Sequence, residues 1–228
     1  MTETPKAGVL SDFNIEVVKN TKVYFVENLR SARRFISSLK LGLVIDELMF
    51  FELDKDTSRK TIKEYLNQVP DSISEIGILS EAGCPGIADP GAKLVAIAHE
   101  MGWKVCPIPG PSSIFLGLMG SGFNGQQFLF HGYLPIKQDE RTKAIRKLEE
   151  DAINKGVTQL FIETPFRNQS LLVDLLNVLK SNTLLCIASN LSSNEELLIT
   201  KKAIDWKNNI PTINKIPTIF LIGRFDTE

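Results

Sequence analysis

The stretch that decides the fold runs Ile76-Gly77-Ile78-Leu79-Ser80-Glu81-Ala82-Gly83-Cys84-Pro85-Gly86-Ile87-Ala88-Asp89-Pro90-Gly91. Its first four residues form a short apolar run typical of a buried β-strand, and a segment of helical period follows from Ala92 to Met101. The twelve-residue loop between them holds three glycines and two prolines, which allow close backbone approach and preset the chain direction. Turn geometry alone explains such residues in many shorter loops. Since open α/β sheets bind ligands beyond the carboxyl ends of their strands, we expect this loop to line a binding site.

A second loop of the same kind follows the expected strand at 105–108. It reads Pro109-Gly110-Pro111-Ser112-Ser113 and leads into a helix. The prolines stiffen the approach, Gly110 brings the backbone close, and the Ser112 hydroxyl can cap the helix. Capping alone would explain this loop. Two such loops at one sheet edge favour a shared binding site.

The rest of the chain alternates short apolar runs with segments of helical period, which is typical of α/β proteins. We expect strands at 23–26, 48–53, 76–79, 105–108, 128–130, 159–162, 184–188, 196–200 and 218–222. We expect helices at 30–39, 58–69, 92–101, 112–119, 139–154 and 168–180, and a short one at 205–206. The sequence turns polar at 133–140, so the expected domains are 1–134 and 135–228.

Composition excludes several classes of protein. The 228 residues include 26 basic and 27 acidic side chains, so the chain is not a uniformly basic nucleic-acid-binding protein. Its three cysteines form no CxxC motif, which argues against a disulfide framework or a zinc ribbon. No apolar run approaches the roughly 18 residues of a membrane span, and no secretory signal is visible, so we expect a cytoplasmic protein. The phosphate-binding motifs GxxxxGK[ST] and GxGxxG are missing.

Charged residues gather where the first expected strand ends. Glu27 ends that strand, and Arg30, Arg33 and Arg34 open the following helix. Cations at a helix N-terminus oppose the helix dipole, so local stability does not explain them. They either pair with an acid or bind an anionic substrate, or else they form a solvated helix face.

Four motifs in order resemble the tetrapyrrole-methylase superfamily, and most closely its branch of small-subunit rRNA cytidine 2′-O-methyltransferases. They are residues 80–91, 109–113, Phe-Leu-Phe-His-Gly-Tyr-Leu-Pro at 128–135 and Phe-Ile-Glu-Thr-Pro-Phe-Arg at 161–167. The resemblance extends from about Tyr24 to Ile222. Glu27, Arg30 and Arg33 also fit the branch's Glu-Asp-Thr-Arg-x-Thr-Arg element, with Asn28 and Leu29 in place of its Asp and Thr.

The resemblance implies two α/β domains, the first with a mainly parallel sheet and the second with a mixed sheet. It also implies S-adenosylmethionine bound in a cleft between them, and a homodimer. Carried over residue by residue, the cofactor-binding positions are Gly83, Cys84, Pro85, Ile87, Ser112, Ser113, Glu163, Ala188 and Pro217. No metal is implied.

Two departures from the family pattern stand out. Family members begin with an apolar strand that ends in a Pro-x-x-Gly turn, whereas residues 1–13 here are polar. We expect either that the true start lies upstream or that a central strand and part of the cofactor pocket are lost. The branch also carries an Arg-Glu-Leu-Thr-Lys element where this chain reads Ser189-Asn190-Leu191-Ser192-Ser193. That difference argues against the rRNA substrate more than against the cofactor.

A sulfonium methyl group is already a strong electrophile, so the protein chiefly has to orient donor and acceptor. A base assists if the acceptor is a ribose hydroxyl, and the candidates are Glu27 and Glu163. Arg30, Arg33 and Arg167 are the candidate phosphate-binding residues. Three hypotheses remain: methylation of ribosomal RNA, the same chemistry on a small molecule or protein, and a non-catalytic homologue that only binds ligand.

Overall fold

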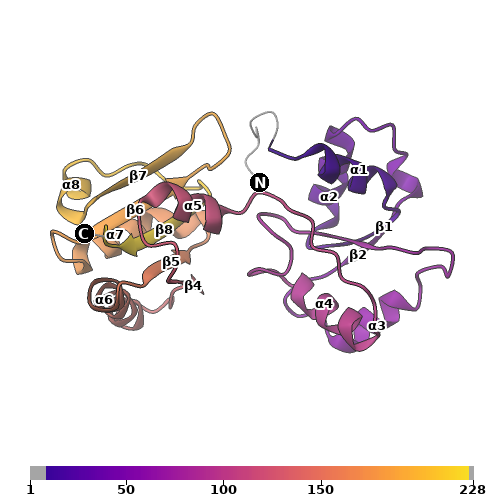
Figure 1. Cartoon of the computed structure of the whole chain (residues 1–228), viewed down its shortest axis with the longest axis horizontal. Helices are drawn as coiled ribbons and strands as arrows, with labels where there is room; N and C mark the ends of the chain where they lie inside the picture. Colours follow the sequence, from indigo (N-terminus) through magenta and orange to yellow (C-terminus); the bar gives the residue numbers. More distant parts are fainter. Residues whose placement is uncertain (1–8, 226–228) are drawn as a thin grey trace. The chain divides into compact units, whose positions relative to one another are not determined.

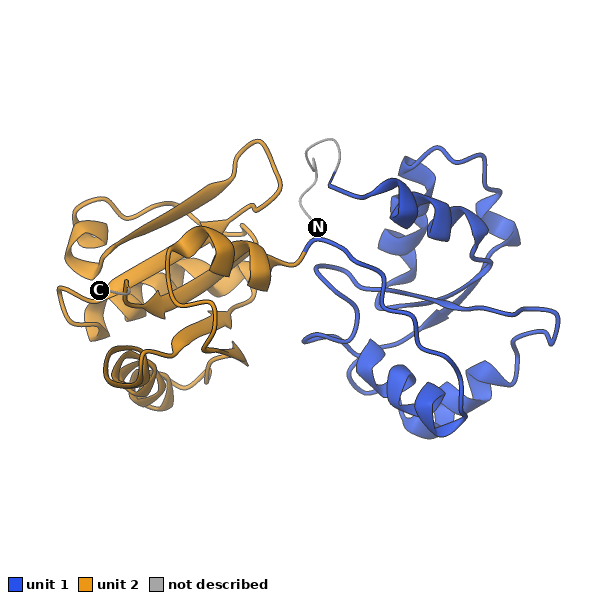
Figure 2. Cartoon of the chain, in the orientation of Figure 1, with its two compact units in different colours: residues 1, 7–111 blue, residues 2–6, 112–228 orange. Residues whose placement is uncertain are grey.

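The computed structural model describes residues 9–225, and the chain divides into two compact units (Figure 2). Among the described residues, unit 1 ends at Pro111 and unit 2 begins at Ser112. The sequence-based boundary lies later, at residue 134. The difference arises because the helix and strand between these positions pack into the second sheet, as described below, while the polar stretch at 133–140 is a connection inside unit 2.

Unit 1 is a three-layered α/β unit around a small parallel sheet (Figure 1). Its strands are β1 (Val23–Val26), β2 (Met49–Glu52) and β3 (Gly77–Leu79), in the order β2-β1-β3. Its helices are α1 (Asp12–Asn20), α2 (Leu29–Ser38), α3 (Arg59–Leu66) and α4 (Gly91–Glu100), with a 3-10 turn η1 (Ile45–Glu47).

The central strand β1 fixes both cores of unit 1, because its side chains alternate between the two faces of the sheet. On one face Val23 and Phe25 pack against α3 and α4, in a cluster with Ile62 and Leu94. On the other face Tyr24 and Val26 pack against α1 and α2, in a cluster that includes Val18, Ala32 and Ile36. All four β1 side chains are buried, which explains the uninterrupted apolar run in the sequence.

The strand expected at 105–108 is not formed. Among the described residues the sheet ends at β3, and the segment after α4 joins no ladder. Pro107, Pro109 and Pro111 have no amide hydrogen to donate to a neighbouring strand, so the sequence resists pairing here. The structure also adds helix α1, which the sequence analysis does not predict. Of the stretch 1–13, residues 1–8 lie outside the described residues, and Asp12 and Phe13 open α1.

Unit 2 holds a five-stranded mixed sheet in the order β4-β5-β8-β6-β7. The strands are β4 (Phe128–Tyr133), β5 (Thr158–Ile162), β6 (Leu184–Ser189), β7 (Leu197–Lys202) and β8 (Thr218–Gly223). Only β4 and β5 pair in parallel, and the other neighbours are antiparallel. The helices are α5 (Ser113–Ser121), α6 (Gln138–Lys155), α7 (Asn168–Val178) and α8 (Ala203–Asn208), with a 3-10 turn η2 (Pro165–Arg167).

Helices cover both faces of this sheet. The larger core lies under α6, α7 and α8, around Phe161, Phe220 and Trp206. On the opposite face α5 covers the sheet (Figure 1), and Leu118 packs with Leu160 and Ile219. The expected α/β class is confirmed, with a parallel first sheet and a mixed second one. Between residues 9 and 225 no helix is both long and apolar enough to cross a membrane.

Candidate functional site

In unit 1 the candidate site lies at one edge of the sheet. All three strands are parallel, so their carboxyl ends meet there, and Glu27 follows β1 while Ser80 and Glu81 follow β3. The Glu81 backbone amide donates a hydrogen bond to the Glu27 carboxylate, with 3.4 Å between nitrogen and oxygen. The Ser31 hydroxyl, from the first turn of α2, donates to the Glu81 carboxylate. The two bonds thereby hold the carboxylates of Glu27 and Glu81 in place at this edge.

The surroundings of Glu27 at this edge change the pKa of its carboxyl group. Burial raises the pKa of the Glu27 carboxyl above its ordinary value, and the negative charges of Asp89 and Glu81 raise it further. The hydrogen bond from the Glu81 amide opposes this rise but does not cancel it. A carboxylate with a raised pKa is a stronger base, so Glu27 is suited to accept a proton.

The loop from Ser80 to Gly91 adopts a tight, self-bonded conformation. Gly83 and Gly86 have φ values of +75° and +80°, which side chains rarely adopt, and this explains the glycines. The Asp89 carboxylate accepts the backbone amides of Gly86, at 2.9 Å, and Gly91, at 2.7 Å. The loop is therefore held by its own hydrogen bonds.

Side chains that the resemblance assigns to the cofactor differ in their exposure. Ile87 is 52% exposed although it is apolar, and Pro85 is also exposed. Cys84 is half-buried, and its sulfur lies 3.9 Å from the carbonyl oxygen of Pro111. An exposed isoleucine on a rigid glycine-proline loop offers an apolar contact to a ligand.

The arginines of α2 have different surroundings. Arg33 forms an ion pair with Asp46 in η1, and its guanidinium lies 5.8 Å from the centre of the Phe50 ring. Arg30 is exposed in the first turn, and no ion pair of Arg30 is found among the described residues. The structure places both on one helix but gives only Arg33 an acidic partner.

In unit 2 the register of the sheet brings the expected residues to one edge. Ile162 of β5 pairs with Ile219, and Ser189 of β6 pairs with Thr218. Glu163 follows β5, Ala188 is near the end of β6, and Pro217 precedes β8, so all three lie at this edge. The backbone amide of Asn190 donates to the Pro217 carbonyl at 3.0 Å, which closes the edge between β6 and β8.

Helix α5 begins at the same edge. A Cβ on Gly117 would lie 3.1 Å from Ile219 and 3.8 Å from Ala188. Phe123, just beyond the helix, contacts Gly223 at the other end of β8. Helix α5 therefore runs along β8 in the same direction. Ser112 is the N-cap residue and is only 8% exposed, yet its hydroxyl makes no capping hydrogen bond. Ser113 is exposed. The Ala188 side chain lies in the core beneath α5.

Glu163 is engaged in a local network. Its carboxylate is buried and accepts hydrogen bonds from Arg167, at 2.6 Å, and from the Thr164 amide, at 2.7 Å. Arg167 is part-exposed, but its Nε is buried and has no partner among the described residues. Glu163 therefore orients Arg167, and both of these hydrogen bonds go to its Oε1 atom.

The structure thus forms two sets of expected residues, each within one unit. The unit 1 set is Glu27 with the loop at 83–87, and the unit 2 set is Ser112, Ser113, Glu163, Arg167, Ala188 and Pro217. The sequence patterns predict no role for Glu81 or Ser31. Glu81 could have been found, since it follows its strand just as Glu27 follows the neighbouring one. In the described part of the chain no cluster of His, Cys, Asp or Glu could hold a metal ion.

No family model matches the chain. Among curated proteins it is 32% identical to a ribosomal RNA small subunit methyltransferase I of Borrelia garinii subsp. bavariensis, over 72% of this chain and 69% of that protein. The proteins of the same name from Thermotoga maritima and Micromonospora olivasterospora are 31% and 30% identical, over 75% and 80% of this chain. The chain covers 74% of the Thermotoga protein and 55% of the Micromonospora protein.

Two solved structures share the fold at low sequence identity. The methyltransferase CobJ is 13% identical with a TM-score of 0.61, over 96% of this chain and 90% of that one. Cobalt precorrin-4 methyltransferase CbiF is 10% identical with a TM-score of 0.60, over 94% and 89%. With two relatives above 30% identity that are matched over more than two thirds of their length, the chain belongs to the ribosomal RNA small subunit methyltransferase I family.

Proposed function

We propose that the chain transfers a methyl group from S-adenosylmethionine to a ribose hydroxyl of small-subunit ribosomal RNA, in the cytoplasm. The observation that carries this proposal is the identity of 32% with a relative named for that RNA, over 72% of the chain. The site supports it because proton acceptors and exposed cations lie at the edge of unit 1 where such a fold binds ligands.

The residues present suit S-adenosylmethionine chemically. Gly83, Cys84 and Pro85 form a rigid turn, and Ile87 beside them offers an exposed apolar contact to an adenine ring. In unit 2, the Ser112 hydroxyl makes no capping hydrogen bond, so it and the Ser113 hydroxyl suit the polar groups of a nucleoside. We also assign Glu163, Ala188 and Pro217 to cofactor binding, because they share one edge of the sheet. The Ala188 side chain lies in the core, so the contact at this position would come from the neighbouring backbone. When bound, the cofactor supplies a methyl group on a positively charged sulfur.

Glu27 is the better supported of the two candidate bases. Its pKa is raised by burial and by neighbouring negative charge, so its carboxylate takes a proton readily. In the proposed step a carboxylate oxygen of Glu27 would accept the proton of the ribose hydroxyl while the ribose oxygen bonds to the methyl carbon. The bond between that carbon and the cofactor sulfur would break, and its electron pair would stay on the sulfur. Glu163 is bonded to Arg167 and the Thr164 amide, which suits a role in holding Arg167 toward an anion.

The remaining candidate substrate contacts are cationic. Arg30 is exposed in the first turn of α2, three residues after Glu27, and we assign it to a phosphate of the RNA. Arg167 has a part-exposed guanidinium and is assigned in the same way. Arg33 is the weakest of the three, since Asp46 already neutralises its charge.

The test is a transfer assay with tritiated S-adenosylmethionine and small ribosomal subunits as acceptor. Label should appear in the RNA, and nuclease digestion should place it on a 2′-O-methylated nucleoside. Glu27→Gln is the matched inactive variant. If label appears in the protein or small-molecule fraction of a cell extract and none appears in RNA, the acceptor is a protein or a small molecule and the proposed RNA acceptor is wrong.

Calorimetry with S-adenosylmethionine tests the remaining hypothesis, a homologue without turnover. Binding heat together with transfer supports the proposal, while binding heat without transfer to any acceptor supports a ligand-binding homologue. CobJ and CbiF offer no support for a tetrapyrrole acceptor, because at 13% and 10% identity the likeness extends to the fold alone.

A further inference from the structure

We infer that the outer face of α2 is a binding track for the phosphodiester backbone of RNA, formed by Arg30, Arg34 and Ser37. This inference rests on the proposed function and deepens it, since it names a contact surface for the RNA beyond the reacting nucleotide. It also gives a role to Arg34, which the resemblance to the family does not assign.

The three residues share one face of the helix. At 3.6 residues per turn, positions 30, 34 and 37 fall within about 60° of one another around the axis. The opposite face carries Ala32 and Ile36, which are buried in the core of unit 1. The track therefore faces solvent, and its two arginines are separated by about 6 Å along the axis.

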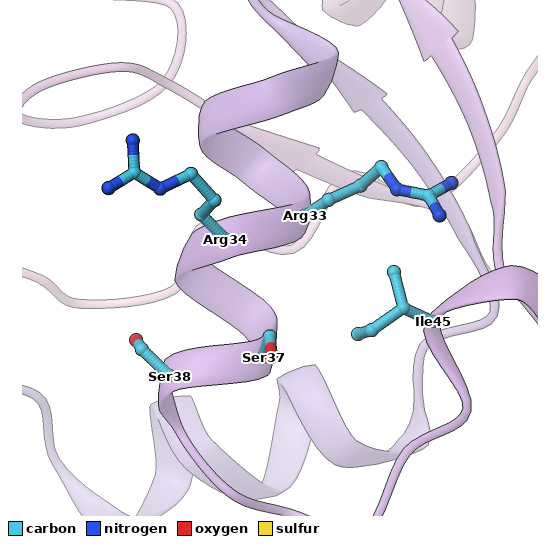
Figure 3. A pocket seen from close by; sticks show the side chains of 5 residues that line it. All are labelled: Arg33, Arg34, Ser37, Ser38 and Ile45. Carbon is cyan, nitrogen blue, oxygen red and sulfur yellow. The ribbon is translucent and has the colours of Figure 1, made fainter.

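A shallow pocket, wide open to solvent, overlaps this surface at Arg34 and Ser37 and does not include Arg30. It is lined by Arg33, Arg34, Ser37, Ser38 and Ile45, so α2 forms one side and η1 the other. Figure 3 shows Arg33 and Arg34 extending to opposite sides of the helix, with Ser37 between them and Ile45 on the side of Arg33. Ser38 donates its hydroxyl to the Phe35 carbonyl, whereas no such bond is found for Ser37 within residues 9–225. The Ser37 hydroxyl is thus available to a ligand in this pocket.

The charge of α2 is uncompensated along the track. The helix sequence LRSARRFISS contains three arginines and no acidic residue, in a chain whose net charge is −1. Asp46 pairs with Arg33, but in the described part of the chain neither Arg30 nor Arg34 has an acidic partner. Like charges four residues apart weaken a helix, so stability of α2 does not explain this pair. An anion on this face would relieve the repulsion.

The position of the helix points to RNA as the anion. Asn28 caps α2 immediately after Glu27, so the helix begins beside the proposed base, and the track leads away from it one turn at a time. Arginine and serine are common phosphate contacts in nucleic-acid complexes. A strand whose ribose reacts at Glu27 would place its neighbouring phosphates along Arg30 and then Arg34 with Ser37.

The test measures RNA affinity as a function of salt for Arg34→Ala and for Ser37→Ala. The probes are a labelled single-stranded RNA oligonucleotide and purified small ribosomal subunits. One lost phosphate contact lowers the slope of log K against log salt by about 0.7 for single strands, so Arg34→Ala should reduce the slope by that amount. Its affinity for S-adenosylmethionine should be unchanged. Ser37→Ala should weaken binding without changing the slope.

Arg146→Ala is the matched control, because Arg146 is an exposed arginine on helix α6 of unit 2. Equal losses in Arg34→Ala and Arg146→Ala would show general attraction between charges and overturn the track. An unchanged slope in Arg34→Ala would overturn it too. So would an Arg34→Ala variant that binds RNA as the wild type does but no longer binds anionic lipid vesicles. Thermal melts of each variant exclude unfolding as the cause of a loss.

These experiments distinguish a failure of the binding track from a failure of the proposed function. If the wild-type protein transfers methyl groups to ribosomal RNA and Arg34→Ala does so with equal kcat/KM, the proposed function stands and the track is wrong. If Arg34→Ala weakens RNA binding but the wild-type protein methylates no RNA, the track stands and the proposed function is wrong.

Discussion

Glu27 combines a position and an environment that favour proton transfer. It follows the central strand of unit 1, and the acidic groups of Glu81 and Asp89 surround it. Because the folded protein holds the Glu27 proton more tightly than the unfolded chain does, protonation stabilises the fold at low pH. That stabilisation is lost as pH rises through the raised pKa. At neutral pH the charged carboxylate therefore costs stability.

We predict that Glu27→Gln lowers kcat for methyl transfer by about 10²- to 10⁴-fold, the usual contribution of a general base. The same variant should melt at a higher temperature than the wild type at neutral pH, because the unfavourable charge is removed. The wild-type kcat should fall as pH is lowered through the raised pKa of Glu27. Kinetics across pH and thermal melts measure these effects.

Glu75→Gln is the control for this prediction, since Glu75 is an exposed carboxylate of the same unit. It should leave both kcat and the melting temperature close to those of the wild type. A Glu27→Gln variant that keeps full activity would remove Glu27 from the mechanism, whatever its stability.

Arg167 offers a second test of what a single side chain contributes. Arg167→Ala leaves the buried Glu163 carboxylate without its charged donor, and an unsatisfied buried group of this kind costs about 1–3 kcal/mol. Urea denaturation should show that loss. The double variant Glu163→Gln/Arg167→Ala should recover part of it, because the neutral amide needs no cation. Equal stability of the wild type and Arg167→Ala would mean that the pair contributes nothing to the fold.

Individual side-chain partners were only partly predictable from the sequence. The position of Glu27 at a strand end follows from the apolar run before it, and Glu163 and Arg167 are separated only by Thr164 and the first two residues of η2. The pairing of Arg33 with Asp46 depends on how η1 folds back beside α2, and the bond between Ser31 and Glu81 joins residues fifty positions apart. Such pairs depend on tertiary packing, which no local pattern encodes.

Among the elements, strands with a partner on each side were the most predictable. The apolar run of β1 predicts a buried central strand, and the structure has one. Residues 105–108 have a similar apolar pattern but no neighbouring strand among the described residues. A strand needs a ladder as well as a favourable sequence, so the pattern alone gave a wrong prediction there.

The contact between Phe123 and β8 should hold the C-terminal end of α5 in place. A Cβ on Gly223 would lie 2.5 Å from Cγ of the buried Phe123 ring, so Gly223→Ala forces the ring or the strand to move. We predict a loss of about 1–3 kcal/mol in the stability of unit 2, as for other overpacked cores. Gly125→Ala is the control, because a Cβ there meets nothing within 4 Å. Urea denaturation of both variants measures the difference, and equal stability would contradict the predicted clash.

For the molecule as a whole, the cores show where the units divide. Each of the four apolar clusters of described residues lies within a single unit, two in each. The sequence places the boundary at 134 because the polar stretch at 133–140 looks like a linker. It could not show that α5 and β4, which precede this stretch, complete the second sheet.

We therefore predict that a fragment of residues 112–228 folds by itself, whereas a fragment of residues 135–228 does not. The longer fragment keeps both faces of the sheet covered. The shorter one loses α5, which leaves Leu160, Ile219 and Leu221 bare on one face, and it loses β4, which exposes the edge of β5. Circular dichroism and urea denaturation should show cooperative unfolding for the longer fragment and aggregation or a broad transition for the shorter one. If both unfold alike, α5 and β4 are dispensable, and the apolar face beneath α5 does not decide where unit 2 begins.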